Sequence, residues 1–244
     1  MNLAQNTVLI TGGASGIGLA FAIRFLQAGS QVIICGRRAD KLQAAQQQYP
    51  QLHTRVCDVG LESEREALFK WVTQEFPEVN VLLNNAGIQR RVDFTQNDEP
   101  WRNHQAEIAI NLEAPIHLSL LFTPHFSQLS RAYIINVTSG LAFVPMAKVA
   151  VYCATKAALH SFTLSLRYQL ANTSVQVLEV IPPAVNTDLG GPGLHTFGAP
   201  LDEFADSIMQ RLADGEEEIG YGTSEKSRLA SGEELKEIFN RMNP

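Results

Sequence analysis

The chain has 244 residues, of which 45% are hydrophobic and 18% are charged, and its formal net charge is −6 at pH 7. This size and composition suit a single α/β domain with a full hydrophobic core. The acidic balance, without a basic block, argues against nucleic-acid binding. No apolar run reaches the roughly 18 residues that a membrane-spanning helix needs.

The cysteines are Cys35, Cys57 and Cys153. Their odd number and scattered positions are typical of buried thiols in a reducing compartment rather than of disulfides or metal ligands. The N-terminus has no positively charged region and leads directly into an apolar strand, so it does not resemble a signal peptide. We therefore expect a cytoplasmic protein with no metal site and no membrane partner.

A phosphate-binding turn is predicted near the N-terminus. Residues 8–10 are an apolar run typical of a strand buried on both faces. A helix is expected over residues 19–28, ended by Gly29. Between the two lies TGGASGIG (residues 11–18), whose glycines would let the backbone approach a pyrophosphate at the helix N-terminus. The alternative is a tight turn that needs glycine only for positive φ.

The residues after the second predicted strand, 31–35, bear on the choice of cofactor. NAD-binding sites commonly place an acid here, which bonds the adenosine ribose hydroxyls. This chain has Gly36 followed by Arg37 and Arg38. A guanidinium group can form paired hydrogen bonds with a 2′-phosphate, which an acid would repel. The pattern favours NADP(H) over NAD(H), although two solvated arginines at a helix start are the alternative.

Strands and helices alternate along the remaining chain. Further strands are predicted over 53–57, 79–83, 132–137, 175–181 and, at an edge, 217–221. Further helices are predicted over 39–49, 62–76, 102–126, 149–170 and 204–212. Such alternation implies a parallel sheet with right-handed crossovers, whose ligands bind beyond the carboxyl ends of the strands. Asp58 and Asn85 fall there, with helix capping or turn formation as alternative roles.

Tyr152 and Lys156 are four residues apart on a predicted helix, so their side chains lie on one face, one turn apart. A free phenol has a pKa of about 10. A neighbouring ammonium group favours the phenolate and lowers that pKa. The pair would then serve as a general acid/base near neutral pH. A solvated helix face is the alternative interpretation of this spacing.

Two segments near the C-terminus stand apart from the alternating pattern. Residues 188–200 are rich in glycine and proline, and we interpret them as a substrate lid, with a disordered surface loop as the alternative. The tail, 222–244, contains a capping box at residues 231–234 that predicts a helix. Leu235, Ile238, Phe239 and Met242 recur along this helix at core spacing, so it needs an apolar partner surface in its own chain or in a neighbour.

Taken together, residues 5–190 resemble the short-chain dehydrogenase/reductase family. The resemblance rests on TGxxxGIG at 11–18, on NNAG at 84–87, and on a catalytic set in fitting order: Asn111, Ser139, Tyr152 and Lys156. Residues 35–38 and 239–243 are similar to the DltE-type oxidoreductases, a bacterial subgroup. One departure is Pro183, which replaces the usual glycine after the sixth strand, so the lid is expected to pivot differently.

The resemblance implies one Rossmann-type doubly wound domain over 1–244, with a mainly parallel seven-stranded sheet flanked by helices and a C-terminal tail helix. It also implies an NADP(H)-dependent oxidoreductase that interconverts a carbonyl and an alcohol by hydride transfer. Tyr152 would protonate the carbonyl oxygen, and Lys156 would lower the pKa of that tyrosine and hold the nicotinamide ribose. Ser139 would hydrogen-bond the substrate oxygen. Asn111 would hold a water that connects Lys156 to solvent.

The same resemblance implies a cofactor site. Asp58 would contact the adenine amino group, and Arg37, with Arg38 and Ser15, the 2′-phosphate. The residues expected to bind NADP(H), with NAD(H) as a further possibility, are Gly12, Ser15, Gly16, Ile17, Gly18, Arg37, Arg38, Asp58, Val59, Asn85, Ala86, Gly87, Tyr152, Lys156, Pro182, Val185 and Thr187.

Two alternatives to the NADP(H)-dependent enzyme stay open: an NAD-dependent alcohol dehydrogenase, and a non-catalytic protein that senses NADP or serves as a scaffold. The expected substrate is a small, uncharged carbonyl or alcohol compound, because residues 143–146 suggest apolar walls. We expect a homodimer or homotetramer, because the helices around Asn111 and Tyr152 resemble those that pair subunits in this family.

Overall fold

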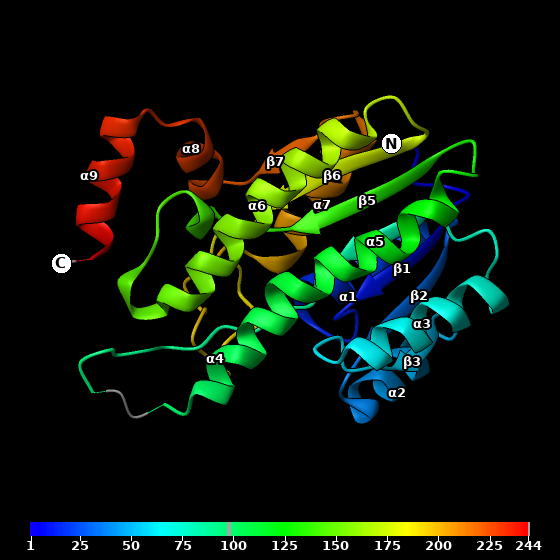
Figure 1. Ribbon diagram of the computed structural model, residues 1–244, viewed down its shortest axis with the longest axis horizontal. Helices are drawn as coiled ribbons and strands as arrows, with labels where there is room; N and C mark the ends of the chain where they lie inside the picture. The colour runs from blue at the N-terminus through cyan, green and yellow to red at the C-terminus, as the bar shows by residue number, and fades with distance from the viewer. Residues whose placement is uncertain (97–98, 244) are drawn as a thin grey trace.

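The computed structural model describes residues 1–96 and 99–243, so residues 97–98 and Pro244, the last residue of the expected tail, lie outside the described residues. Its centre is a seven-stranded sheet in the order β3-β2-β1-β4-β5-β6-β7. Every neighbouring pair of strands is parallel. The expected doubly wound α/β fold with a C-terminal helix is therefore confirmed (Figure 1).

The elements follow one another in the predicted alternation. The strands are β1 Thr7–Thr11, β2 Gln31–Gly36, β3 His53–Val56, β4 Val81–Asn84, β5 Ala132–Val137, β6 Val175–Ile181 and β7 Glu218–Gly220. The helices are α1 Gly16–Gln27, α2 Ala39–Gln48, α3 Glu62–Glu75, α4 Trp101–Ile108, α5 Ala114–Phe126, α6 Ala150–Leu170, α7 Leu201–Ala213, α8 Thr223–Leu229 and α9 Gly232–Met242.

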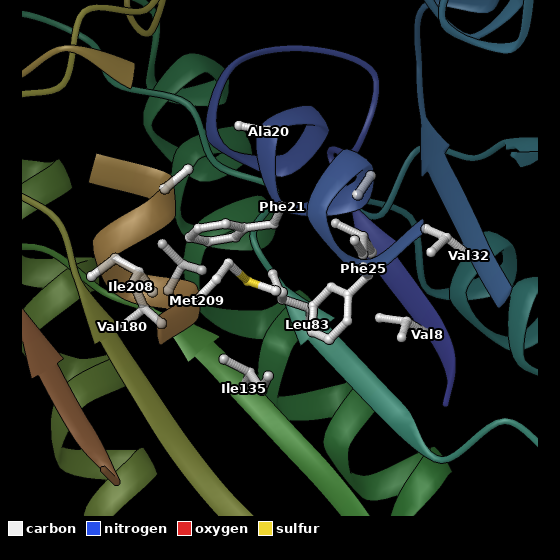
Figure 2. Packing of buried hydrophobic residues seen from close by; sticks show 14 of the residues in the cluster. Val8, Ala20, Phe21, Phe25, Val32, Leu83, Ile135, Val180, Ile208 and Met209 are labelled. Carbon is white, nitrogen blue, oxygen red and sulfur yellow. The ribbon is translucent and has the colours of Figure 1, made fainter. Parts of the chain in front are cut away.

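Helices cover both faces of the sheet, so the central strands are buried on both sides. All residues of β1, β4 and β5 are buried, which explains the apolar runs 8–10, 81–83 and 132–135 within them. Helices α1, α2 and α7 contribute to the core on one face, and α3, α5 and α6 to the core on the other. Figure 2 shows Phe21 and Phe25 of α1 beside Met209 of α7, above Leu83 and Ile135 of the sheet. Each fully buried phenylalanine contributes about 1.5–3 kcal/mol.

The strand order places the functional end of the sheet. After β3 the chain returns to the other side of β1 and adds β4, so the order reverses between β1 and β4. Ligands of such sheets bind at the carboxyl ends of the strands beside this reversal. The arrowheads in Figure 1 point toward this end, where α8 and α9 also lie.

Two helical features differ from the sequence-based expectations. The continuous helix expected over 102–126 is interrupted by a π-helical segment, Ala109–Glu113, between α4 and α5. Helix α8 was not expected at all. It contains few apolar residues, and it is held instead by long-range bonds, such as the one that Ser224 Oγ donates to the Ile181 carbonyl.

The capping box of the tail helix is present. Ser231 Oγ accepts a hydrogen bond from Glu234 N, and a carboxylate oxygen of Glu234 accepts one from Ser231 N at 2.7 Å. The apolar side of α9 stays largely uncovered within this chain: Phe239 is 39% exposed, and α9 contains no buried residue. In the described part of the chain, no helix has the length and apolar character required to cross a membrane.

Candidate active site

The four expected catalytic side chains meet at the carboxyl end of the sheet. Asn111 comes from the π-helical segment, Ser139 directly follows β5, and Tyr152 and Lys156 lie on α6. All four are buried. A Cβ atom added at Gly87, just after β4, would lie 3.4 Å from Asn111 Oδ1 and 3.8 Å from Lys156 Nζ. Segments far apart in the sequence therefore form one site.

Asn111 holds the chain after β4 against helix α6. Its Oδ1 accepts a hydrogen bond from Ile88 N at 2.9 Å, and its Nδ2 donates to the Ile88 carbonyl at 2.8 Å and to Thr155 Oγ1 at 3.3 Å. π-Helical turns often occur at functional sites, because the extra residue redirects side chains. Both N–H groups of the amide are thus used, which leaves the second lone pair of Oδ1 for the expected water.

Lys156 and Tyr152 are adjacent in a buried environment. Lys156 Nζ donates to the Val137 carbonyl at 2.7 Å and lies 5.7 Å from the centre of the Tyr152 ring. Burial lowers the pKa of Lys156 to about 8, and the charge of Glu179 opposes this change. The lysine therefore titrates within reach of physiological pH.

Burial also dominates the tyrosine. It raises the pKa of Tyr152 well above its usual value, while a hydrogen bond with Ser139 lowers that pKa and the charges of Cys153 and Glu107 raise it. This direction is opposite to the lowering expected from the neighbouring ammonium group, because desolvation disfavours the phenolate more strongly. The phenol is thus kept in its protonated form, which is the form that donates a proton.

The glycine-rich turn fits a pyrophosphate. Gly12 has φ +65°, and a Cβ added there would lie 2.9 Å from Ala86 Cα. At Gly18 an added Cβ would lie 2.5 Å from both Asn85 Nδ2 and the Gly12 carbonyl oxygen. The Ser15 side chain does not cap α1, so backbone N–H groups at the start of this helix can face a ligand.

Asn85 and Thr11 fix the shape of this turn. Asn85 Nδ2 donates to the carbonyls of Thr11 and Gly12, at 3.0 and 3.3 Å. Thr11 Oγ1 accepts from the backbone N–H groups of Asn85 and Ala86, both at 3.0 Å. The Asn85 side chain therefore helps to form the turn, and its contact with the cofactor stays a prediction. Thr187 closes the opposite side, 3.4 Å from a Cβ added at Gly16.

Four residues expected around the adenosine end lie together. Arg38 Nη2 donates to Ser15 Oγ at 2.8 Å, and Arg37 Nη1 lies 3.9 Å from Asp58 Oδ2. Arg37 is half exposed, its side chain at 52%. A Cβ added at Gly36 would have no neighbour within 4 Å, so the space beside this glycine is open. These groups fit a phosphate monoester.

The remaining expected cofactor residues line the same edge. Ile17 packs on the core with only part of its surface exposed, and Val59 is buried. The Pro182 carbonyl accepts from Gly140 N at 2.9 Å. Val185 is buried and forms a bridge with Ala199. Their contacts with a cofactor stay a prediction.

The segment 188–200 reaches the catalytic tyrosine through Leu189. Leu189 and Met146 both pack against the buried cluster that contains Tyr152. Phe197, by contrast, is 78% exposed. Apolar side chains from two separate segments therefore pack against the cluster that contains the tyrosine.

Two buried acids near the site were missed by the sequence analysis. Glu107, one turn before Asn111, accepts a hydrogen bond from Arg90 N at 3.1 Å, and burial raises the pKa of its carboxyl to about 7. Glu179 lies within β6, whose other residues are apolar except for the exposed Gln176, and it is fully buried. The acid inside an apolar strand was the one available signal for Glu179.

One possible group of metal ligands, Glu62, Glu66 and His117, lies on α3 and α5. It shares no residue with the catalytic or cofactor set. Both glutamates are exposed, and exposed acids commonly occur together without an ion.

Comparisons with known proteins identify the family to which this sequence is similar. A family model described as short chain dehydrogenase matches residues 6–194. The Uncharacterized oxidoreductase DltE of Bacillus subtilis (strain 168) is 48% identical over 248 residues, which cover 100% of this chain and 98% of that protein. The expected resemblance to DltE-type oxidoreductases is thus confirmed.

Solved structures share the fold. A short chain dehydrogenase from Burkholderia cenocepacia J2315, in complex with NADP, superposes with a TM-score of 0.86 at 22% identity, covering 99% of each chain. A metagenomic short-chain oxidoreductase in complex with NADP gives a TM-score of 0.76 at 26% identity, covering 90% of this chain and 97% of that one. With a family model over most of its length and a relative over all of it, the chain belongs to the short-chain dehydrogenase family of NAD(P)-dependent oxidoreductases.

Proposed function

We propose that this protein is an NADP(H)-dependent carbonyl reductase, with Tyr152 as the general acid. The observation that carries the proposal is a buried, protonated phenol beside a lysine, at the end of the sheet that also carries the glycine-rich turn. Bound NADPH would supply a hydride to the carbonyl carbon. NADP is present in two structures of related fold, which supports this choice of cofactor.

In the proposed reaction, Tyr152 donates its phenolic proton to the carbonyl oxygen as negative charge develops there. The charge of Lys156 then stabilises the phenolate that remains. Ser139 Oγ accepts a hydrogen bond from Leu141 N at 3.1 Å, so its own O–H group can be donated to the substrate oxygen. Asn111 joins the loop after β4 to helix α6 by hydrogen bonds, which fixes the position of Tyr152 and Lys156 relative to that loop.

The direction of reduction is favoured by the state of the tyrosine. A phenol whose pKa is raised stays protonated at neutral pH and needs no preceding proton uptake. Oxidation of an alcohol would require the phenolate, which burial disfavours. The NAD-dependent alcohol dehydrogenase therefore remains the second candidate, and the absence of an acid at Gly36 also argues against it.

We propose a small, uncharged substrate, because Met146 and Leu189 beside Tyr152 are apolar. Residues 188–200 would act as the lid that excludes water from the developing alkoxide. Three free, buried cysteines support action in a reducing compartment such as the cytoplasm.

We also propose a homodimer or homotetramer. Apolar side chains on α5 and α6 are exposed, Leu120 at 64% and Tyr168 at 86%, as expected for a subunit interface. The edge strand β7 and helix α9 offer a second surface of this kind.

The test is NADPH oxidation with a broad panel of ketones, aldehydes and diketones, with Tyr152→Phe assayed beside the wild type. Removing the phenolic hydroxyl deletes the proton donor while keeping the ring, so turnover should fall by about 10²–10⁴-fold with unchanged NADPH affinity. Retained turnover in Tyr152→Phe would refute the role of the tyrosine. Tight NADPH binding without turnover of any compound would instead favour the sensor or scaffold.

A further inference from the structure

A fully buried carboxylate, that of Glu179, is hydrogen-bonded to residues that are close to the catalytic lysine in the sequence or on its helix. Glu179 is the only acid in β6, and its Oε1 accepts a hydrogen bond from Thr138 Oγ1 at 2.6 Å. His160 Nδ1 lies 3.0 and 2.9 Å from its two carboxylate oxygens. An ionised carboxylate in the protein interior is strongly unfavourable unless it is hydrogen-bonded and faces positive charge. The side chains of Thr138 and His160 therefore stabilise this acid in the protein interior.

The hydrogen bonds of Glu179 lead to the catalytic groups by two routes. Directly after β5, Thr138 stands between Val137, whose carbonyl accepts from Lys156 Nζ, and the catalytic Ser139. On α6, His160 is one turn after Lys156 and lies on the same helix face. Both routes join Glu179 to residues next to Lys156 in the sequence or on the helix face. The charge of Glu179 raises the pKa of Lys156 against the effect of burial.

The imidazole of His160 also reaches the chain that follows Ser139. Its ring lies 4.7 Å from the ring of Phe143, centre to centre. The hydrogen bond with Glu179 raises the pKa of His160, with burial opposing it. Glu218 of β7 raises this pKa further, and Arg167 of α6 lowers it. Thr138 and His160 thus contact the carboxylate directly, Lys156 is reached by its charge, and Arg167 and Glu218 act through His160.

We propose that Glu179, held in place by Thr138 and His160, is a positioning residue whose negative charge keeps Lys156 protonated during the reaction. The proposal rests on the reductase function and deepens it. A buried lysine without a counter-charge would lose its proton near neutral pH and could no longer stabilise the Tyr152 phenolate. Glu179 offsets that loss without touching substrate or cofactor.

The decisive variant is Glu179→Gln, which keeps the size of the side chain and can still bond Thr138 and a neutral His160. Removing the negative charge lowers the pKa of Lys156 below its present value of about 8. The alkaline limb of the pH profile of kcat/KM should therefore move about one pH unit lower. Glu179→Asp keeps the negative charge, so the alkaline limb of its kcat/KM profile should stay at the pH of the wild type, even if the shorter side chain lowers kcat.

The matched control is Glu217→Gln. Glu217 is 63% exposed and faces the outer side of Arg167, so it should leave the profile unchanged. An alkaline limb that does not move in Glu179→Gln would overturn the proposal. A limb that moves equally in the Gln and Asp variants would also overturn it, because packing rather than charge would then be responsible.

A second measurement does not depend on turnover. In protein labelled with ¹³C at the lysine ε-carbon, the resonance absent from Lys156→Met identifies Lys156, and its titration gives the pKa directly. Glu179→Gln should lower the midpoint of this titration by about one unit. An unchanged midpoint in a folded variant would reject the proposal even if the wild type reduces ketones. Failure of the wild type to reduce any compound would instead count against the reductase function alone.

Discussion

Replacement of Arg37 by alanine should weaken NADPH binding much more than NADH binding, because only NADPH carries the 2′-phosphate. A hydrogen bond to a charged group is worth about 1.5–3 kcal/mol. Two features of the structure favour the low end of that range. The Arg37 side chain is 52% exposed, and it already lies 3.9 Å from Asp58, whose charge partly offsets its own. A loss of about 1.4 kcal/mol corresponds to about tenfold weaker NADPH binding.

The assay is titration of each cofactor by calorimetry at low and high salt. Arg37→Ala should lower NADPH affinity about tenfold and change NADH affinity less than twofold, and the difference should shrink at high salt because exposed charges are screened. The control is Arg131→Ala, which removes an exposed guanidinium just before β5, at the opposite end of the sheet. Equal weakening of NADPH and NADH in Arg37→Ala would refute the assigned role, and Arg38 would then be the next residue to replace.

Three further results are expected. Lys156→Met should abolish turnover yet stabilise the fold by about 1–2 kcal/mol at pH 7, because the lowered pKa of the buried lysine means that the native state holds its proton unfavourably. That advantage should shrink in denaturant titrations as pH rises from about 8 toward 10.4, where only the unfolded state keeps the proton; an advantage independent of pH would contradict this account. Gly18→Ala should lose NADPH binding and lower the melting temperature, since its Cβ would lie 2.5 Å from the Gly12 carbonyl; Gly232→Ala, with open space around it, is the control. Tyr168→Glu should shift the assembly toward monomers in light scattering at micromolar concentration, and a monomeric wild type would disprove the proposed oligomer.

Much of the fold could be predicted because its elements leave local patterns in the sequence. The buried strands β1 and β5 contain apolar runs, 8–10 and 132–135, and the capping box before α9 is a pattern of two residues at fixed spacing. The glycine-rich turn could be predicted from the spacing of its glycines. The structure gives the reason for two of them, because other parts of the chain approach closely at Gly12 and Gly18. Each of these patterns is made of residues that are close together in the sequence, so one sequence is sufficient to find it.

The features that could not be predicted depend on distant contacts. The π-helical turn at Asn111 leaves no pattern of residue types that separates it from an α-helix. The raised pKa of Tyr152 follows from complete burial, which spacing along a helix does not reveal. Glu179 is a single acid in a strand, and its importance emerges only when Thr138 and His160 are found beside it.

The parallel order of the strands has a consequence for how the chain folds as it is synthesised. β1 leaves the ribosome before the other strands of this sheet, but its second partner is β4, and Thr7 N donates to Asn80 Oδ1 across a separation of 73 residues. Until β4 emerges, one edge of β1 has no strand to pair with and is open to wrong associations. Sheets closed by such non-local pairings fold slowly. The nascent chain should therefore need protection until about residue 84 has been translated, after which β5 and β6 can add in order.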